Sequence, residues 1–312
     1  MPSNDTCRSL LNIAGVRFIL ADLSAATAWP EAFHDFVGKP NDTDLDCEVH
    51  CQGPDEALAV EAPLPDTPWL FRAQDGQCEL TRRAADGVAI WRIRAPLAFD
   101  RATITWHPQR FHAVYGDYVT SWTSALGLSL LIFRLRAFSG LGLHGSAAVL
   151  DGQGVLCSGV SGVGKSTISR LLHAAGASVL TDERPFVRQF PTPTGEVQPL
   201  SSAAFRVYGS PWPSSARFAC NASAPLRRIY FLEHGPVNRL TPLTPREAFN
   251  QFVQVTTIPW HAPELFDPCL KTLDTLLHSV SCAVLSFRPT AEVVDLIRQD
   301  LAAQPRKVTS EQ

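Results

Sequence analysis

Lysine is scarce in this sequence of 312 residues, in which only four of the 27 basic residues are lysines and the rest are arginines. The formal net charge is −3, with acidic and basic residues mixed along the chain. A sequence with this balance is not expected to use nucleic acid or an anionic membrane as its main partner. An acidic ligand must then be bound by a local group of positive residues. Because lysine is scarce, Lys165 stands out among the candidates.

Cysteines occur without a recurring pair spacing. Eight are present, and the nearest pair is Cys47 and Cys51, with no second pair or closely spaced histidines beside it. Ordinary thiols are expected, and a zinc site at this pair stays open as the alternative. Because no basic and apolar secretory leader opens the sequence, we expect a reducing, cytoplasmic environment.

Long hydrophobic runs are also missing. A long uncharged stretch, residues 119–133, contains several serines and threonines and is shorter than the roughly 20 apolar residues that span a membrane. A buried helix is the expected structure there, with membrane contact as the alternative.

The order of apolar segments predicts a β-rich N-terminal domain over residues 1–116, a linking helix over 117–139, an α/β domain over 140–303 and a disordered tail over 304–312. The α/β domain should contain a mixed sheet flanked by helices. Its expected strands are 144–150, 155–158, 178–181, 186–190, 204–208, 228–232 and 283–287. Its expected helices are 168–175, 245–253, 263–280 and 290–302.

A glycine-rich motif of the form Gly-x-x-x-x-Gly-Lys-Ser lies between the strand expected at 155–158 and the helix that follows. Glycines allow backbone N–H groups to surround a phosphate, Lys165 supplies a cation for the β and γ oxygens, and the Ser166 hydroxyl can bind Mg²⁺. The helix N-terminus adds a partial positive charge. The motif therefore predicts ATP binding with Mg²⁺. The residues expected to contact the nucleotide are Gly159, Ser161, Gly162, Val163, Gly164, Lys165, Ser166 and Thr167.

Two acidic residues, Asp182 and Glu183, follow the strand expected at 178–181. Carboxyl ends of strands are where α/β proteins gather ligands, and Gly176 is placed to end the preceding helix. A carboxylate at this position can take a proton from an attacking hydroxyl, with Glu183 or Ser166 near the metal. The alternative is that the pair only caps a loop.

The sequence resembles the HPr kinase/phosphorylase-like kinases, whose nucleotide-binding fold is similar to that of phosphoenolpyruvate carboxykinase. The resemblance covers about residues 140–300. It rests on the His144-Gly145 pair 21 positions before Lys165, on the loop itself, and on the acidic pair beginning 17 positions after Lys165. The chain departs from the family at Thr167, where the family has Glu, and at Glu183, where it has Asp. It therefore resembles a divergent branch, and the resemblance does not extend to HPr as substrate or to the phosphorylase reaction.

The resemblance implies roles for individual residues. Asp182 would be the base that deprotonates a serine-type hydroxyl, and His144 would lie beside the phosphates. Lys165 would act in catalysis by holding the phosphates, while Ser166, Asp182 and Glu183 would bind Mg²⁺. A homo-oligomer is also plausible by this resemblance. A histidine at the start of a strand is more often structural. The functional role expected for His144 therefore depends on its spacing from Lys165, which matches that of the family.

The sequence is compatible with two functions. The first is an ATP-dependent kinase that phosphorylates a hydroxyl on a peptide, protein or small molecule. The second is a non-catalytic ATP-binding regulatory or scaffold module in a biosynthetic gene set. A GTPase is disfavoured because the guanine-reading motif Asn-Lys-x-Asp does not occur. Further contacts to phosphate or an acidic substrate are expected among Arg184, Arg206, Arg227, Arg228 and Arg239.

Overall fold

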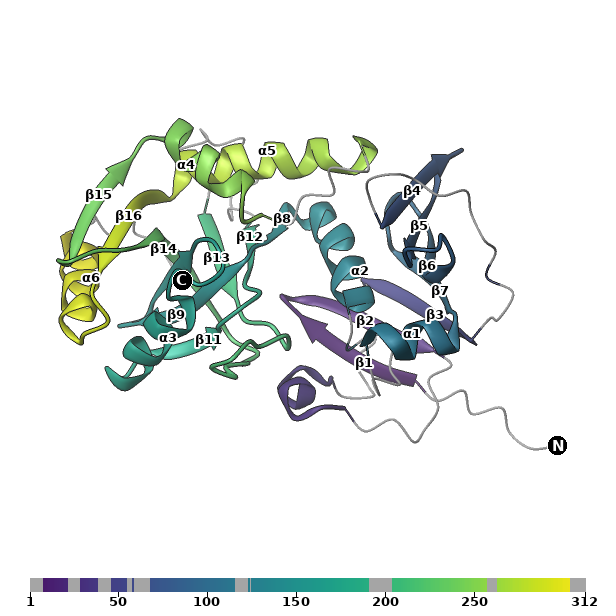
Figure 1. Ribbon diagram of the computed structural model, residues 1–312. Helices are drawn as coiled ribbons and strands as arrows, with labels where there is room; N and C mark the ends of the chain where they lie inside the picture. Colours follow the sequence, from purple (N-terminus) through teal and green to yellow (C-terminus); the bar gives the residue numbers. More distant parts are fainter. Residues whose placement is uncertain are drawn as a thin grey trace, which may run out of the picture. The chain divides into compact units, whose positions relative to one another are not determined.

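The computed structural model describes residues 8–21, 29–38, 46–54, 58, 68–115, 123, 125–190, 204–256 and 263–303. The chain divides into two compact units (Figure 1). Unit 1 consists of Met1–Leu141 with Ile258–Thr272, and unit 2 of Gly142–Thr257 with Leu273–Gln312. The chain combines sheets and helices, which confirms the mixed α/β class.

Unit 1 is built on a seven-stranded sheet in the order β1-β2-β3-β7-β6-β5-β4. The β2–β3 and β3–β7 pairs are parallel, and the other neighbours are antiparallel. The β-rich character expected of the N-terminal region is therefore confirmed. The strands are β1 (Arg8–Ile13), β2 (Val16–Ala21), β3 (Cys47–Pro54), β4 (Trp69–Gln74), β5 (Gln77–Arg83), β6 (Ala89–Pro96) and β7 (Arg101–Trp106).

The helices of unit 1 correct the expectation of one long linking helix. The described part of that region begins with a 3-10 turn at Thr123, and α2 spans Ala125–Leu135. A 3-10 turn over Arg136–Phe138 follows, and the left-handed backbone of Ser139, with φ of 47°, ends it. Two further short elements, a 3-10 helix at Glu31–Phe36 and α1 at Pro108–Tyr115, were not expected. Residues 116–122 and 124 lie outside the described part of the chain.

Unit 2 contains a nine-stranded mixed sheet, with β14 at its centre. β14 runs parallel to β10 on one side and to β16 on the other, and its first residues pair with β13. β9 is antiparallel to both β10 and β11, so β10 and β11 point in the same direction. The strands are β8 (Gly140–Gly142, whose first two residues belong to unit 1), β9 (Gly145–Leu150), β10 (Gln153–Ser158), β11 (Ser178–Thr181), β12 (Phe186–Phe190), β13 (Ala204–Tyr208), β14 (Ser223–His234), β15 (Arg239–Leu243) and β16 (Ser281–Phe287).

Unit 2 also contains helices, which Figure 1 labels. They are α3 (Lys165–Ala174), α4 (Pro245–Val253), α5 (Pro263–Ser279, whose first part belongs to unit 1) and α6 (Glu292–Ala303). Apolar residues of α3 and α6, such as Leu172 and Ile297, join one buried cluster with residues of β9, β10, β14 and β16. On β14, Phe231 packs against Phe252 of α4 with ring centroids 4.9 Å apart. Burial on both faces explains the continuous apolar run at the centre of β14.

Local turn chemistry sets the ends of β9 and α3. Asp151 and Gly152 both have positive φ, 52° and 77°, as the tight two-residue turn between β9 and β10 requires. Gly176, with φ of 86°, follows the end of α3, and its N–H donates to the His173 carbonyl. The expected role of Gly176 as the residue that ends this helix is confirmed.

Several predicted elements have the observed bounds, namely β11, β12, β13 and α4. β14 is longer than expected, and β15 was missed because Arg239–Leu243 contains Pro242 and shows no apolar alternation. A proline is tolerated there because, among the described strands, β15 pairs with β16 alone. The predicted tail, residues 304–312, lies outside the described residues.

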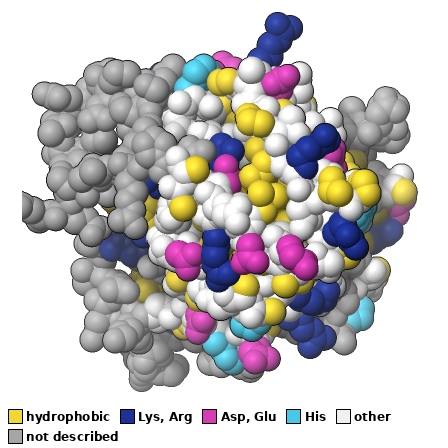
Figure 2. Space-filling model, turned by 90° about the vertical axis from the view of Figure 1, so that its left-hand side faces the viewer, with side chains coloured by type: hydrophobic (Ala, Val, Ile, Leu, Met, Phe, Trp, Pro, Cys, Tyr) yellow, Lys and Arg dark blue, Asp and Glu magenta, His cyan; other side chains and the backbone are white. Residues whose placement is uncertain are grey.

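Figure 2 shows the face of unit 2 on which β15 and α6 lie. Hydrophobic side chains occupy its centre, and charged side chains of both signs surround them. This mixture is what the nearly balanced composition leads one to expect.

Candidate functional site

The glycine-rich loop, residues 159–164, joins the end of β10 to the start of α3. Its three glycines have φ of 151° at Gly159, 82° at Gly162 and 103° at Gly164. Residues other than glycine rarely adopt these φ values, so the shape of the loop depends on its glycines. A Cβ at Gly164 would also lie 2.9 Å from Cζ of Phe287, which leaves no room for a methyl group.

Lys165 folds back over this loop. Its Nζ atom donates hydrogen bonds to the Gly159 and Val160 carbonyls, both at 3.0 Å, and the residue is only 7% exposed. Burial lowers the pKa of the Lys165 amine below 10.5, whereas the neighbouring Glu183 carboxylate raises it. The loop is thus held in a curled form by the same cation that was expected to contact phosphate.

The start of α3 suits an anion. The first amides of any helix have no carbonyl one turn earlier to bond, and the helix dipole makes this end positive. Gly164 is the residue that precedes the helix, and Ser166 lies in its first turn. Backbone amides, a cation and a hydroxyl therefore meet in one place, which fits a phosphate group and its Mg²⁺.

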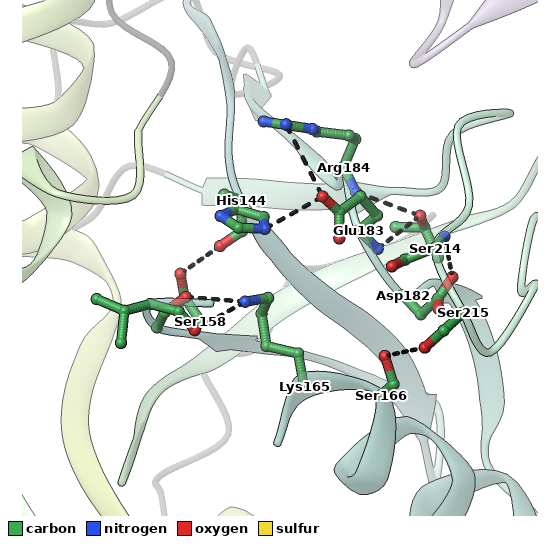
Figure 3. Close-up of polar contacts among 12 residues, drawn as sticks. His144, Ser158, Lys165, Ser166, Asp182, Glu183, Arg184, Ser214 and Ser215 are labelled. Atoms are coloured by element: carbon green, nitrogen blue, oxygen red, sulfur yellow. Dashed lines mark hydrogen bonds and ion pairs between the residues drawn. The ribbon is translucent and has the colours of Figure 1, made fainter. Parts of the chain in front are cut away.

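The acidic pair, Asp182 and Glu183, lies at the same edge of the sheet as the glycine-rich loop. The pair follows β11 and the loop follows β10, and these two strands point in the same direction with β9 between them. Figure 3 shows Lys165 directed toward Glu183 and His144, and Ser166 directed toward Ser215 beside Asp182. The expected catalytic and metal-binding residues are therefore brought together from three separate segments of the chain.

Asp182 has no exposed surface. Its Oδ1 accepts the backbone N–H of Ser214 at 3.0 Å, and its Oδ2 accepts that of Ala216 at 2.8 Å. An ionised carboxylate has about four acceptor sites, so two remain beyond these bonds. The segment around residue 215 thus covers the carboxylate that was expected to act as base.

Glu183 is more accessible than Asp182, with a quarter of its side chain exposed. Its Oε1 lies 3.2 Å from Nε2 of His144 and 3.8 Å from Nη2 of Arg184. The pKa of the Glu183 carboxyl is held below 4.5, chiefly by the hydrogen bond from His144, while burial acts in the opposite direction. Glu183 is therefore kept ionised next to the Lys165 amine.

His144 is fixed by its backbone as well as its ring. Its N–H donates to the Val255 carbonyl at 2.8 Å, and its carbonyl accepts the Ser158 hydroxyl at 2.7 Å. The next residue, Gly145, donates its N–H to the Glu183 carbonyl at 3.0 Å. One backbone contact, from Gly145, and the ring contact of His144 thus join the start of β9 to Glu183.

Two site contacts were missed by sequence reasoning. Ser215 donates its hydroxyl to the Ser166 hydroxyl at 3.1 Å, and His234 at the end of β14 places Nε2 3.2 Å from the Gly162 carbonyl. The only signal near Ser215 was the stiff Pro-Trp-Pro sequence that ends at Pro213. Nothing local in the sequence marks His234.

Three of the five candidate arginines differ in where their contacts lie. Arg184 lies at the site, whereas Arg206 donates to Ser223 and Arg228 is paired with Asp300 at 2.7 Å. Arg228 is buried and forms part of the core of unit 2. Of these residues, Arg184 is the one that the structure places beside the acidic pair.

Among the described residues, no group of three or more His, Cys, Asp and Glu side chains is arranged to hold a metal ion. Cys47 is a buried free thiol whose pKa burial raises to about 12, and the side chain of Cys51 lies outside the described part. Mg²⁺ needs no such cluster, because it is commonly bound by one or two carboxylates together with substrate phosphates.

A hollow of about 440 Å³ lies elsewhere in unit 2, lined by residues that include Arg227, Leu243 and His278. None of the residues of the loop site borders it. In the described part of the chain, no helix has the length and apolar character needed to cross a membrane.

No protein-family model matches the sequence, and no curated protein matches it. Among solved structures, the chain is similar to the HPr(Ser) kinase/phosphatase from Coxiella burnetii, with 12% identity and a TM-score of 0.27. The match covers 52% of this chain and 92% of the other. This likeness is distant, so the functional argument rests on the geometry of the site.

Proposed function

We propose that this chain binds ATP with Mg²⁺ and transfers the γ-phosphoryl group to a serine-type hydroxyl on a peptide, protein or small molecule. One observation carries the proposal. The Lys165 amine, the Ser166 hydroxyl and the Asp182 and Glu183 carboxylates meet at one edge of the sheet, at the start of a helix that a glycine-rich loop precedes.

Each group has a chemical task in this reaction. The loop amides and Lys165 would hold the β- and γ-phosphates, and Ser166 with Glu183 would hold Mg²⁺, which neutralises phosphate charge when bound. Asp182 would accept the proton of the attacking hydroxyl. His144 keeps the Glu183 carboxylate oriented and ionised through the 3.2 Å contact between them.

Phosphoryl transfer of this kind depends on positioning and on charge neutralisation more than on covalent chemistry. The burial of Lys165 and the hydrogen bonds to both oxygens of Asp182 support the positioning that this reaction would need. The HPr-kinase-like type of core suggested by the sequence spacing belongs to the same proposal.

The proposal is tested with γ-labelled ATP and Mg²⁺, added to the purified chain together with a lysate of peptides, proteins and metabolites. A labelled acceptor that is lost with Lys165→Ala and with Asp182→Asn, but kept with Lys271→Ala on the exposed face of α5, supports a kinase. Label transfer that persists unchanged in Lys165→Ala would show that another site is responsible.

A second candidate, a non-catalytic ATP-binding module, is favoured by one feature. Asp182 is fully buried and both its oxygens accept amides, so a base of this kind would be inaccessible to a separate acceptor without movement of residues 214–216. Binding of ATP and Mg²⁺ without any transfer, in the presence of the complete lysate, would favour this module over the kinase.

A further inference from the structure

Ser215 is held beside the start of α3 by several hydrogen bonds of its segment. Its two neighbours, Ser214 and Ala216, donate their backbone N–H groups to the two oxygens of Asp182. Its carbonyl accepts a hydrogen bond from Nη2 of Arg170 at 3.4 Å. Its hydroxyl donates to the Ser166 hydroxyl at 3.1 Å, as Figure 3 shows. A serine hydroxyl is thus presented to the residue expected to hold Mg²⁺.

The segment that carries Ser215 is folded tightly against the end of β11. The Cys220 N–H donates to the Leu180 carbonyl at 3.0 Å, and the Thr181 hydroxyl lies 3.2 Å from the Ser210 hydroxyl. A Cβ at Gly209 would lie 2.7 Å from the Leu180 carbonyl, so only glycine permits this approach. Prolines at 211 and 213 restrict the backbone further.

Access to Asp182 distinguishes Ser215 from a hydroxyl of another molecule. Because Asp182 has no exposed surface, an external acceptor reaches it only after residues 214–216 have moved away. Ser215 lies between the two amides that hold Asp182, and it is itself exposed to solvent. The chain itself therefore holds the Ser215 hydroxyl against Ser166, on the segment whose amides bind Asp182.

We propose that Ser215 is a self-phosphorylation site, which accepts the γ-phosphoryl group of a nucleoside triphosphate bound to the same chain. This inference rests on the proposed kinase function. A bond forms between the Ser215 oxygen and the γ-phosphorus, and the bond from the γ-phosphorus to the β,γ-bridging oxygen breaks. The nucleoside diphosphate leaves with that oxygen, and the hydroxyl proton passes to Asp182.

Positive groups of α3 lie near the position that the phosphorylated product would occupy. A phosphoserine carries about −1.5 to −2 charge at neutral pH and pairs well with Arg side chains or with a helix N-terminus. Arg170 already contacts the Ser215 carbonyl, and α3 begins at Lys165. A phosphate on Ser215 would thus lie near two positive groups of α3, which partly offset its repulsion by Asp182.

The test uses the purified full-length chain with ATP and Mg²⁺, and intact-mass and peptide mass spectrometry as readouts. We expect one added phosphoryl group per chain, located at Ser215, at a rate independent of protein concentration because the reaction occurs within one chain. Ser215→Ala and Lys165→Ala should abolish the modification. Ser214→Ala should keep it, because it removes a neighbouring hydroxyl but not the backbone amide that binds Asp182. Ser215→Thr retains a hydroxyl and should yield phosphothreonine.

A binding measurement separates this inference from the proposed function. The wild type should bind a non-hydrolysable ATP analogue with Mg²⁺, as measured by calorimetry. If the analogue binds and the wild type labels a separate acceptor, but Ser215 stays unmodified or another residue carries the phosphate, self-phosphorylation at Ser215 is wrong and the kinase proposal stands. If the analogue does not bind to the wild type, both proposals are wrong.

Discussion

The His144 ring places Nε2 3.2 Å from Oε1 of Glu183, joining the start of β9 to the residue pair after β11. This contact is the largest cause of the lowered pKa of the Glu183 carboxyl. Both side chains are about a quarter exposed, so water screens the interaction and it contributes at most about 1 kcal/mol to stability. Its main effect is to fix the charge and position of Glu183 beside Lys165.

We expect His144→Ala to raise the pKa of Glu183 toward 4.5. A lowered carboxyl pKa stabilises the fold at pH values above 4.5, and this contribution disappears as pH falls through the folded-state pKa. The stability difference between wild type and His144→Ala should therefore be present at neutral pH and vanish in acid. Carbon NMR titration of the glutamate carboxyls measures the pKa directly. Glu247 of α4, whose lowered pKa comes from Thr244, serves as the internal control and should not change.

Lys165→Ala should weaken binding of an ATP analogue roughly 10- to 150-fold, since a hydrogen bond to a charged group contributes about 1.5–3 kcal/mol. Because burial lowers the pKa of this amine, it loses its proton at a lower pH than an exposed lysine does. Binding to the wild type should accordingly begin to decline on the alkaline side below pH 10.5. Calorimetry across pH measures both effects, and Lys271→Ala should bind as the wild type does. Undiminished binding by Lys165→Ala would remove Lys165 from the phosphate site.

Gly162→Ala and Gly164→Ala form a matched pair in the glycine-rich loop. Both glycines have positive φ, so each substitution should cost about 1–2 kcal/mol from backbone strain alone. No atom lies within 4 Å of a Cβ at Gly162, whereas a Cβ at Gly164 meets the buried Phe287 ring at 2.9 Å. Gly164→Ala should therefore lower the free energy of unfolding by more than Gly162→Ala, as measured by urea denaturation. Equal losses would mean that the Phe287 ring moves aside without cost.

Asp300→Ala should destabilise unit 2 strongly, by about 3–5 kcal/mol, because it leaves the buried Arg228 charge without its partner. Asp300 accepts hydrogen bonds from Nε of Arg228 at 2.7 Å and from the Tyr230 hydroxyl at 2.8 Å. Asp295, also on α6, is exposed and lies 3.6 Å from Arg298. Asp295→Ala should change stability by less than about 0.5 kcal/mol, and thermal unfolding of the two variants tests the difference.

Sequence patterns predicted the structure best where it depends on residues that are neighbours along the chain. The positive φ at Gly176 and the turn at Gly152 follow from local backbone chemistry, and the bounds of β11, β12 and β13 follow from short apolar runs between turn residues. The helix expected at 117–139 was wrong in its details. Its apolar composition indicates burial but does not show where a 3-10 turn replaces the α-helix, as it does at Arg136–Phe138.

By itself, the sequence determined that a glycine-rich loop joins a strand to a helix, with Lys165 and Ser166 at the start of that helix and two carboxylates after the next strand. Spacing along the chain encodes these relations because they involve consecutive elements. Only the tertiary structure decided how the two carboxylates differ. Asp182 is buried under amides supplied from residues 214 and 216, and Glu183 faces His144 and Lys165. Those partners come from distant segments, and the pairing of strands across the sheet, which no local pattern specifies, brings them together.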